Sequence, residues 1–285
     1  MSLRGATVIS NSGNNGPFSE LLPSLNASYC YYSPRAPSSS AWVTTVGATF
    51  GPEHGIPERA CQSDLGTLIT SGGGFSTIES RPFWQDEAVS NYLASNMPNG
   101  TFNQNGRGYP DVSITGYFYP FFDVDGGSFL HSGTENAAAI FAGMVSLANA
   151  ARLNAGKGPV GMLNIILYSS FGNFTNDITE GESNCGQAYY DVLPYCCKDV
   201  GFKAAKGWDP MTGLGSINFK AFSEFLFNLG DSGTISFWFA QHLIKIFSFL
   251  YSWKYQRSNE HAYMLSLRNL QEIQKNFVNL FSHHN

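Results

Sequence analysis

A short polar turn opens the most apolar stretch of the chain. Ser132, Gly133, Thr134 and Glu135 come just before residues 137–148, which are almost wholly apolar. A hydroxyl at the entrance to a helix can act as a nucleophile in acyl transfer, because the helix N-terminus then faces the developing oxyanion. Glu135 suits the first helical turn electrostatically, but its charge would repel an oxyanion there. We expect the Ser132 hydroxyl, three residues earlier, to point elsewhere.

Asn14 is a second residue that could take part in such chemistry. It lies in the polar loop 10–16, which follows a short apolar run. A side-chain amide can donate a hydrogen bond to an oxyanion, and asparagine also suits a turn with positive φ. Both interpretations stay open. His54 and His131 are the only histidines before residue 231, so a Ser-His-Asp arrangement has little support, and we expect both to be loop or surface residues.

The residue pattern predicts the elements that must position these side chains. The turn at 132–135 should open a helix over 135–153, ended by Gly156, and because this helix is apolar on all faces we expect it to be buried. The aromatic run 117–122 should pack in the core or in a hairpin that turns at 123–127; a peptide-binding wall is the lesser alternative. Further predicted elements are strands at 6–10 and 42–50, helices at 84–95 and 160–169, and a glycine-rich turn at 71–76.

Composition indicates a folded protein with many tight turns. Hydrophobic residues make up 43% of the 285 residues and charged residues 13%, which excludes a disordered chain. Thirty glycines and thirteen prolines favour an α/β or β-rich enzyme scaffold over a helical bundle. The net charge of −5 and the absence of a basic stripe argue against a nucleic-acid partner.

The cysteines and the N-terminus bear on the compartment. Five cysteines without a CxxC pair leave at least one thiol outside any intramolecular disulfide. Sequons at Asn26, Asn99 and Asn173 would be used only in a secretory pathway. No signal peptide is visible, and the first strand begins almost at Met1. We therefore expect a chain truncated at its start, with a sheet edge left open.

Composition changes near residue 230. Residues 231–285 hold four of the six histidines and carry five Lys/Arg against three Asp/Glu. Residues 235–255 are aromatic and fairly apolar, but Gln241, His242 and Lys245 interrupt them, and a lysine near the middle of a membrane span is costly. We predict a domain over 1–230 and a helical tail over 231–285, with membrane contact by the tail as the lesser alternative.

Six segments, in this order and spacing, resemble the sedolisin (S53) family of serine peptidases, which includes lysosomal tripeptidyl-peptidase and fungal and bacterial acid peptidases. The segments are RG with SGN at 4–14, WVTTVG at 42–47, SGGGFS at 71–76, GYPDVS at 108–113, SGT at 132–134, and GWDP with TGLG at 207–215. The resemblance covers about residues 1–225 and corresponds to the C-terminal part of the catalytic domain. It implies a subtilisin-like, doubly wound α/β fold with a mostly parallel sheet.

The same resemblance implies which catalytic groups are present. Glu135 stands at the position of the family's nucleophilic serine, and Asn14 at that of its oxyanion aspartate. The family's general-base glutamate and its orienting aspartate precede the oxyanion motif and have no position in this chain. The resemblance thus implies a serine-type peptidase domain that is catalytically inactive. The alternatives are a peptide-binding or regulatory module that keeps the substrate cleft, and an active peptidase with altered chemistry.

A structural calcium site is also implied by the resemblance. The matching positions are Asp177, Ile178, Ala205, Gly207 and Asp209, and two carboxylates with several carbonyls supply the hard oxygen ligands that Ca²⁺ prefers. The alternative is that Asp177 caps a turn and residues 207–209 form a plain loop. Relatives further suggest a disulfide between Cys30 and Cys185, and a lysosomal or extracellular location.

Overall fold

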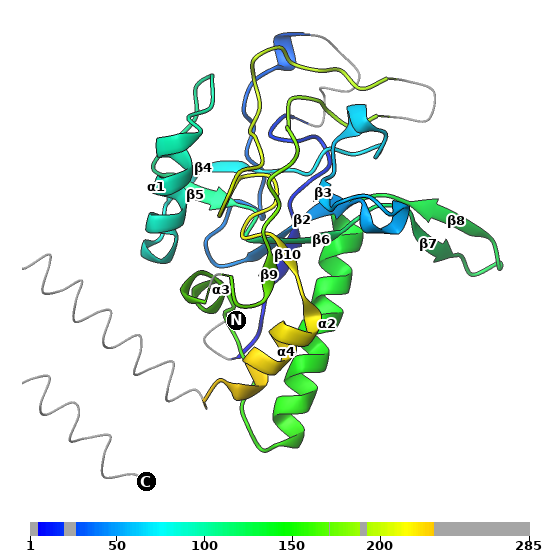
Figure 1. Ribbon diagram of the computed structural model, residues 1–285, viewed down its shortest axis with the longest axis vertical. Helices are drawn as coiled ribbons and strands as arrows, with labels where there is room; N and C mark the ends of the chain where they lie inside the picture. Colours follow the sequence, from blue (N-terminus) through cyan, green and yellow to red (C-terminus); the bar gives the residue numbers. More distant parts are fainter. Residues whose placement is uncertain (1–4, 20–26, 171, 189–192, 231–285) are drawn as a thin grey trace, which may run out of the picture. The chain divides into compact units, whose positions relative to one another are not determined.

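The computed structural model describes residues 5–19, 27–170, 172–188 and 193–230 (Figure 1). The chain divides into two units, residues 1–228 and 229–285. The fold below is that of the first unit, and the helical tail predicted over 231–285 lies outside the described residues. Among the helices that are described, none is both long and apolar enough to cross a membrane.

A mixed, mostly parallel sheet forms the centre of the unit. Its order is β1-β2-β6-β10-β9, with β3 on the end of β2. The parallel strands are β1 (Ile9–Asn11), β2 (Thr44–Phe50), β6 (Val112–Thr115) and β10 (Ser216–Ile217), while β3 (Arg59–Ala60) and β9 (Thr175–Asn176) run antiparallel. All seven residues of β2 are buried, as expected for a strand covered on both faces. The strands predicted at 6–10 and 42–50 are thus confirmed, with shifted ends.

Two helices pack together on this sheet. α2 (Thr134–Asn154) contacts β1, β2 and β6, and α4 (Phe219–Asn228) lies beside it (Figure 1). The Phe141 and Phe222 rings join the two helices, with centroids 5.7 Å apart. The remaining helices are α1 (Asp86–Ser95), α3 (Asn164–Ser169) and the 3-10 turns Ala27–Tyr29, Pro52–His54, Ser63–Leu65 and Phe83–Gln85.

The helix bounds follow the sequence pattern, with two corrections. The helix predicted over 160–169 is only Asn164–Ser169, because Gly161 has φ +66°, a left-handed conformation that a helix does not contain. The prediction that the long helix is buried on all faces is wrong. Phe141 and Val145 of α2 are buried, whereas Leu147 is 63% exposed, since no described element covers that face of the helix.

Two antiparallel ribbons accompany the main sheet. One pairs β4 (Gly74–Ser80) with β5 (Gly106–Tyr109), and the other pairs β7 (Tyr119–Phe122) with β8 (Ser128–His131). The second ribbon is the predicted hairpin, and it projects from the end of the sheet (Figure 1). Phe121 stacks on Phe129 across it at 5.6 Å, while Phe122 is 76% exposed. The aromatic run therefore packs mainly within a hairpin, while Tyr117 at its start packs against the core residue Phe50.

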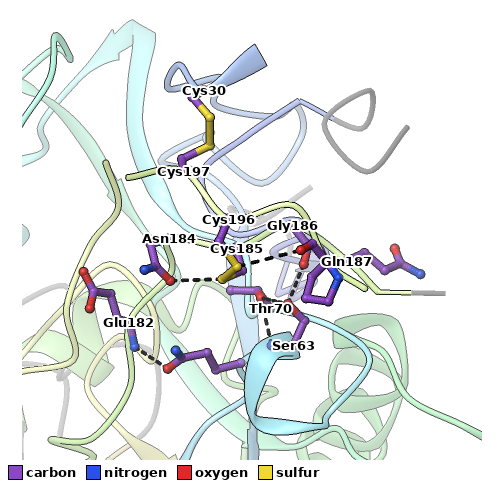
Figure 2. Close-up of a disulfide and its surroundings, with 12 residues drawn as sticks. Cys30, Ser63, Thr70, Glu182, Asn184, Cys185, Gly186, Gln187, Cys196 and Cys197 are labelled. Atoms are coloured by element: carbon purple, nitrogen blue, oxygen red, sulfur yellow. Dashed lines mark hydrogen bonds between the residues drawn. A yellow bond between two sulfur atoms is a disulfide. The ribbon is translucent and has the colours of Figure 1, made fainter. Parts of the chain in front are cut away.

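The cysteine pairing differs from the one that relatives suggested. Cys30 is joined to Cys197 and Cys185 to Cys196 (Figure 2). Cys61 is a buried free thiol. The expected bond between Cys30 and Cys185 is wrong because the segment before Cys197 runs antiparallel to residues 184–186. Gly186 N–H donates to Tyr195 O at 3.0 Å. This pairing sets Cys185 opposite Cys196 and leaves Cys197 for Cys30.

A buried ion pair joins Arg107 in β5 to Asp111, which directly precedes β6. Arg107 and Asp111 are both fully buried, and Nη2 of the arginine lies 2.5 Å from Oδ2 of the aspartate. The guanidinium also donates to Ser40 O at 3.1 Å and to Val43 O at 3.0 Å. Asp111 in turn accepts the Thr45 N–H at 2.8 Å. The pair thus ties β2 and β5 to the turn before β6.

Removing the arginine side of this pair should be costly. We expect Arg107→Met to lower the free energy of unfolding by about 3–5 kcal/mol, because it leaves the Asp111 carboxylate buried without its cation. The matched control is Arg81→Met, since Arg81 pairs with Asp86, whose side chain is 62% exposed, and such pairs contribute about 1 kcal/mol or less. Urea denaturation of both variants measures the difference, and equal losses would contradict the role given to the buried pair.

Candidate functional site

Asn14 and Glu135, 121 residues apart in the chain, are in direct contact. Asn14 Nδ2 donates to Glu135 Oε2 at 3.0 Å. The orientation of the amide is set from its other side, because Asn14 Oδ1 accepts the Thr134 N–H at 2.9 Å and the Thr134 hydroxyl at 3.0 Å. The fold therefore brings the two predicted site residues together at the N-terminus of α2, with the amide donors of Asn14 directed at the carboxylate.

Close backbone contacts hold the loop that carries Asn14. The loop follows β1, and Gly13 N–H donates to the Thr134 hydroxyl at 3.1 Å. Gly72 N–H donates to Gly13 O at 2.8 Å, and Thr70 N–H donates to Asn14 O at 2.9 Å. A Cβ on Gly72 would lie 2.2 Å from Ser12 O, so the glycine-rich segment 71–76 can approach this loop only without a side chain.

The Glu135 side chain folds back over the turn that precedes the helix. A Cβ added to Gly133 would lie 2.3 Å from the Glu135 carboxyl carbon, so the turn needs glycine for this carboxylate position. The carboxylate is still 45% exposed, and its Oε1 lies 3.7 Å from His131 Nε2. Asn136 Nδ2 donates to His131 O at 3.0 Å. A carboxylate at the first turn of a helix is stabilised by the helix dipole.

The other polar candidates lie away from this contact. The Ser132 hydroxyl accepts the Phe118 N–H at 3.1 Å at the base of the hairpin. It therefore points away from the contact between Asn14 and Glu135, as expected. His54 is exposed, and its ring lies against Tyr117 at 5.3 Å. His131 ends β8 with a side chain that is 42% exposed, so it is a surface residue as expected, and it faces Glu135.

The two carboxylates of the implied calcium site converge on one loop. Asp177 accepts the Gly207 N–H through both oxygens, at 3.2 and 3.1 Å. Asp209 accepts the N–H groups of Ala205 at 3.2 Å and of Met211 and Thr212 at 2.9 Å, and the Thr212 hydroxyl at 3.0 Å. Ala205 and Gly207 thus lie between the carboxylates of Asp177 and Asp209.

Asp209 is fully buried, whereas Asp177 is exposed. Burial raises the pKa of Asp209 to about 7, and the hydrogen bonds donated to it oppose that rise. Its described polar partners are all uncharged, so a divalent cation would offset the cost of keeping the carboxylate ionised. Gly207 has φ +86°, and a Cβ there would meet nothing within 4 Å, which leaves room beside the loop. The carboxylates of Asp177 and Asp209 are hard oxygen donors of the kind that Ca²⁺ prefers, so in its chemistry this donor set fits the ion.

Sequence reasoning missed the polar groups that hold these loops in place. Thr134 bridges Gly13 and Asn14, and the Ser71 hydroxyl accepts the Ala48 N–H at 3.0 Å and donates to Met211 O at 2.7 Å. The sequence did contain a hint, because both hydroxyls stand next to glycine. Glycine lets two backbones come close, and a hydroxyl between them can then form hydrogen bonds with their carbonyl and amide groups. A pocket of about 380 Å³ is lined by Arg59, Glu180 and Lys203, and also by Thr179 and Ala204, which adjoin Ile178 and Ala205 in the chain.

No family model matches the chain, but individual known proteins are similar to it in sequence. The chain is 35% identical over 248 residues to tripeptidyl-peptidase sed4 of Aspergillus fumigatus, which covers 80% of this chain and 39% of that protein. It is 32% identical over 249 residues to physarolisin of Physarum polycephalum, covering 78% and 42%.

A solved structure shares the fold. Pseudomonas sedolisin, a serine-carboxyl proteinase, superposes with a TM-score of 0.56 and 25% identity, covering 79% of this chain and 56% of that one. The chain spans about two fifths of the length of the curated relatives it matches. Together with the subtilisin-like, mostly parallel α/β sheet described above, these matches show that the chain belongs to the sedolisin family of serine peptidases.

Proposed function

We propose that this chain is a sedolisin-type domain that binds peptides beside the N-terminus of α2 but does not form an acyl-enzyme. The observation that carries the proposal is the hydrogen bond of 3.0 Å from Asn14 Nδ2 to Glu135 Oε2. The Asn14 amide, which could stabilise an oxyanion, is already bonded to a carboxylate. That carboxylate stands where the resemblance puts the nucleophilic serine.

The physical reason is the charge that Glu135 brings to the site. Acyl transfer develops negative charge on a carbonyl oxygen, and the site must supply donors at the place where it forms. A carboxylate there opposes the developing charge and competes for the Asn14 amide. Glu135 also offers no hydroxyl to be acylated. The tripeptidyl-peptidase activity named for the relatives therefore does not follow for this chain, and peptide binding is the part of their function that we carry over.

An activity assay with a matched variant tests this proposal. The purified full-length chain is incubated with tripeptide substrates at pH 3–6, beside Glu135→Ala and the control Glu87→Ala, which removes a first-turn acid from α1. We expect no turnover above the buffer rate for any of the three proteins. Turnover by the unaltered chain and by Glu87→Ala that is lost in Glu135→Ala would show that Glu135 is catalytic and would refute the proposal.

Peptide binding should depend on the charge of Glu135. We expect Glu135→Gln to bind a fluorescent peptide with a free C-terminal carboxylate about two- to five-fold more tightly, because a first-turn charge contributes roughly 0.3–1 kcal/mol. The control Glu87→Gln should leave the affinity unchanged. Fluorescence anisotropy gives the Kd values, and no binding by any of the variants would count against a peptide-binding role.

We further propose that Asp177 and Asp209 hold a structural Ca²⁺, with carbonyls of Ile178, Ala205 and Gly207 as the other protein ligands. Support comes from the convergence of the two acids on the loop 205–209. The buried Asp209 has only uncharged partners among the described residues. A bound ion would fix this loop next to the core rather than take part in bond cleavage.

Removing calcium should lower stability. At a calcium concentration of 100 Kd the ion contributes about 2.7 kcal/mol, so we expect EDTA to lower the Tm by about 5–10 °C in a domain of this size. Asp177→Asn should lower the Tm by itself and make it insensitive to EDTA. The control Asp125→Asn, in the exposed hairpin turn, should keep the full response. An unchanged Tm of the unaltered chain on adding EDTA would rule out the site.

The location we propose is extracellular or lysosomal. Two disulfides, Cys30–Cys197 and Cys185–Cys196, favour an oxidising compartment. The sequon residues Asn99 and Asn173 are both exposed, so a glycosylation enzyme could reach them.

A further inference from the structure

The pocket of about 380 Å³ lies where three segments that are far apart in the sequence meet. Its lining residues belong to the segments 59–65, 179–182 and 203–204. Backbone hydrogen bonds hold these segments together, because Ala60 N–H donates to Glu180 O at 2.9 Å and Ala204 N–H donates to Gly181 O at 3.0 Å. Small-molecule sites measure roughly 300–1,000 Å³. The fold therefore provides a preformed pocket whose volume suits a small ligand.

A buried amide with a free donor borders this pocket. Gln62 is only 8% exposed and is one of the lining residues. Its Oε1 accepts the Glu182 N–H at 2.7 Å, which fixes the orientation of the amide and leaves Nε2 as the donor. Within the described chain, no residue accepts a hydrogen bond from this Nε2. Because buried polar groups are ordinarily hydrogen-bonded, the Gln62 donor indicates a ligand that brings an acceptor into the pocket.

Two charges of opposite sign stand next to each other at the same pocket. Glu182 and Lys203 oppose each other in an antiparallel bridge. The adjoining hydrogen bond from Ser183 N–H to Phe202 O, at 2.8 Å, makes them a non-hydrogen-bonded pair, whose side chains lie close together on one face. Among the described residues, neither charged group takes part in an ion pair. Both charges are thus available to a ligand.

The other two charges of the pocket are already matched. Arg59 Nη2 lies 3.1 Å from Glu180 Oε2, and the guanidinium carbon lies 6.0 Å from the centre of the Phe50 ring. Arg59 and Glu180 therefore form a neutral wall. The groups left to recognise a ligand are one cation, one anion and one amide donor, from Lys203, Glu182 and Gln62.

We propose that this pocket binds a free α-amino acid in its zwitterionic form. The ligand carboxylate accepts hydrogen bonds from Lys203 Nζ and Gln62 Nε2, and the ligand ammonium donates to the Glu182 carboxylate. Leu65, which is 51% exposed, and Ala204 offer apolar contact to the ligand side chain, so an aliphatic amino acid fits best.

The spacing of the protein charges favours an amino acid over other small ligands. Both charges of an α-amino acid are carried by one carbon atom, and both protein charges come from opposed positions of one bridge. In an extended peptide the two terminal charges move apart by about 3.3–3.6 Å for each added residue. A simple anion or cation would leave Glu182 or Lys203 without a partner. The proposal is independent of peptide binding beside Glu135 and of calcium.

An NMR titration of the ¹⁵N-labelled full chain with L-leucine tests the proposal. The buffer contains calcium and is held at about pH 6, where both charges of the ligand are present. We expect saturable shifts of the Gln62 side-chain amide signals. Leucinamide, which lacks the carboxylate, and N-acetyl-leucine, which lacks the ammonium, should each bind about ten-fold more weakly, because each loses a hydrogen bond between charged groups.

Two substitutions assign the two ends of the ligand. Lys203→Met should weaken L-leucine binding about ten-fold and remove the preference for L-leucine over leucinamide. Glu182→Gln should instead remove the preference for L-leucine over N-acetyl-leucine. The controls Lys198→Met and Glu87→Gln, at exposed residues that do not line the pocket, should leave every affinity unchanged. Circular dichroism checks that all four variants fold.

Three outcomes would overturn the proposal. These are no saturable shift at Gln62, equal affinities for the three compounds, or preferences that Lys203→Met and Glu182→Gln leave as they are in the unaltered chain. None of the three bears on the fluorescent-peptide or EDTA measurements, so this proposal and the proposed function fail separately.

Discussion

The contact of backbone with backbone at Gly72 and Gly73 is the constraint on which the rest of this structure depends. A Cβ on Gly73 would lie 1.7 Å from Pro210 O, and one on Gly72 would lie 2.2 Å from Ser12 O. These two glycines therefore sit between the loop that carries Asn14 and the loop that carries Asp209. No other residue type fits in either place without moving a main chain. The neighbouring Ser71 hydroxyl closes the junction by donating to Met211 O at 2.7 Å.

Because of this junction, the two candidate sites share one support. Asn14 keeps its place through Thr70 and Gly72, which bond to its loop, and Thr134 then fixes the direction of its amide. Asp209 keeps its place through the turn 209–213, in which Asp209 and Gly213 exchange backbone hydrogen bonds of 3.1 and 2.9 Å. A scaffold of this kind preserves the geometry of a site even when the chemistry of one residue in it changes. Glu135 is held in this environment by the Asn14 amide, which donates to its carboxylate at 3.0 Å.

The long helix α2 is apolar on all sides, but only one of its faces is buried. Phe141, Val145 and Ala148 bury one face on the sheet, and this burial is enough to place Thr134 and Glu135 at the open end of the helix. The opposite face is just as apolar, yet Leu147 remains exposed. Composition alone predicted that every face of α2 is buried. It could not show which of these faces another element of the described chain would cover. The same limit explains why the apolar residues Val8, just before β1, and Ile9, within it, are only half-buried.

The sequence by itself determined the family, the parallel α/β class and, to within a few residues, β1, β2, the hairpin, α1 and α2. It also singled out Glu135, Asn14, Asp177 and Asp209 as candidate site residues. It could do so because turns and apolar helices or strands are specified by residues that are close together in the sequence. Only the tertiary structure decided that Asn14 donates to Glu135, that Arg107 pairs with Asp111 in the core, and that Cys30 bonds to Cys197. Two of these contacts join residues more than a hundred positions apart, and the third depends on the shared burial of both charges. Such contacts depend on how the elements pack, which no local pattern contains.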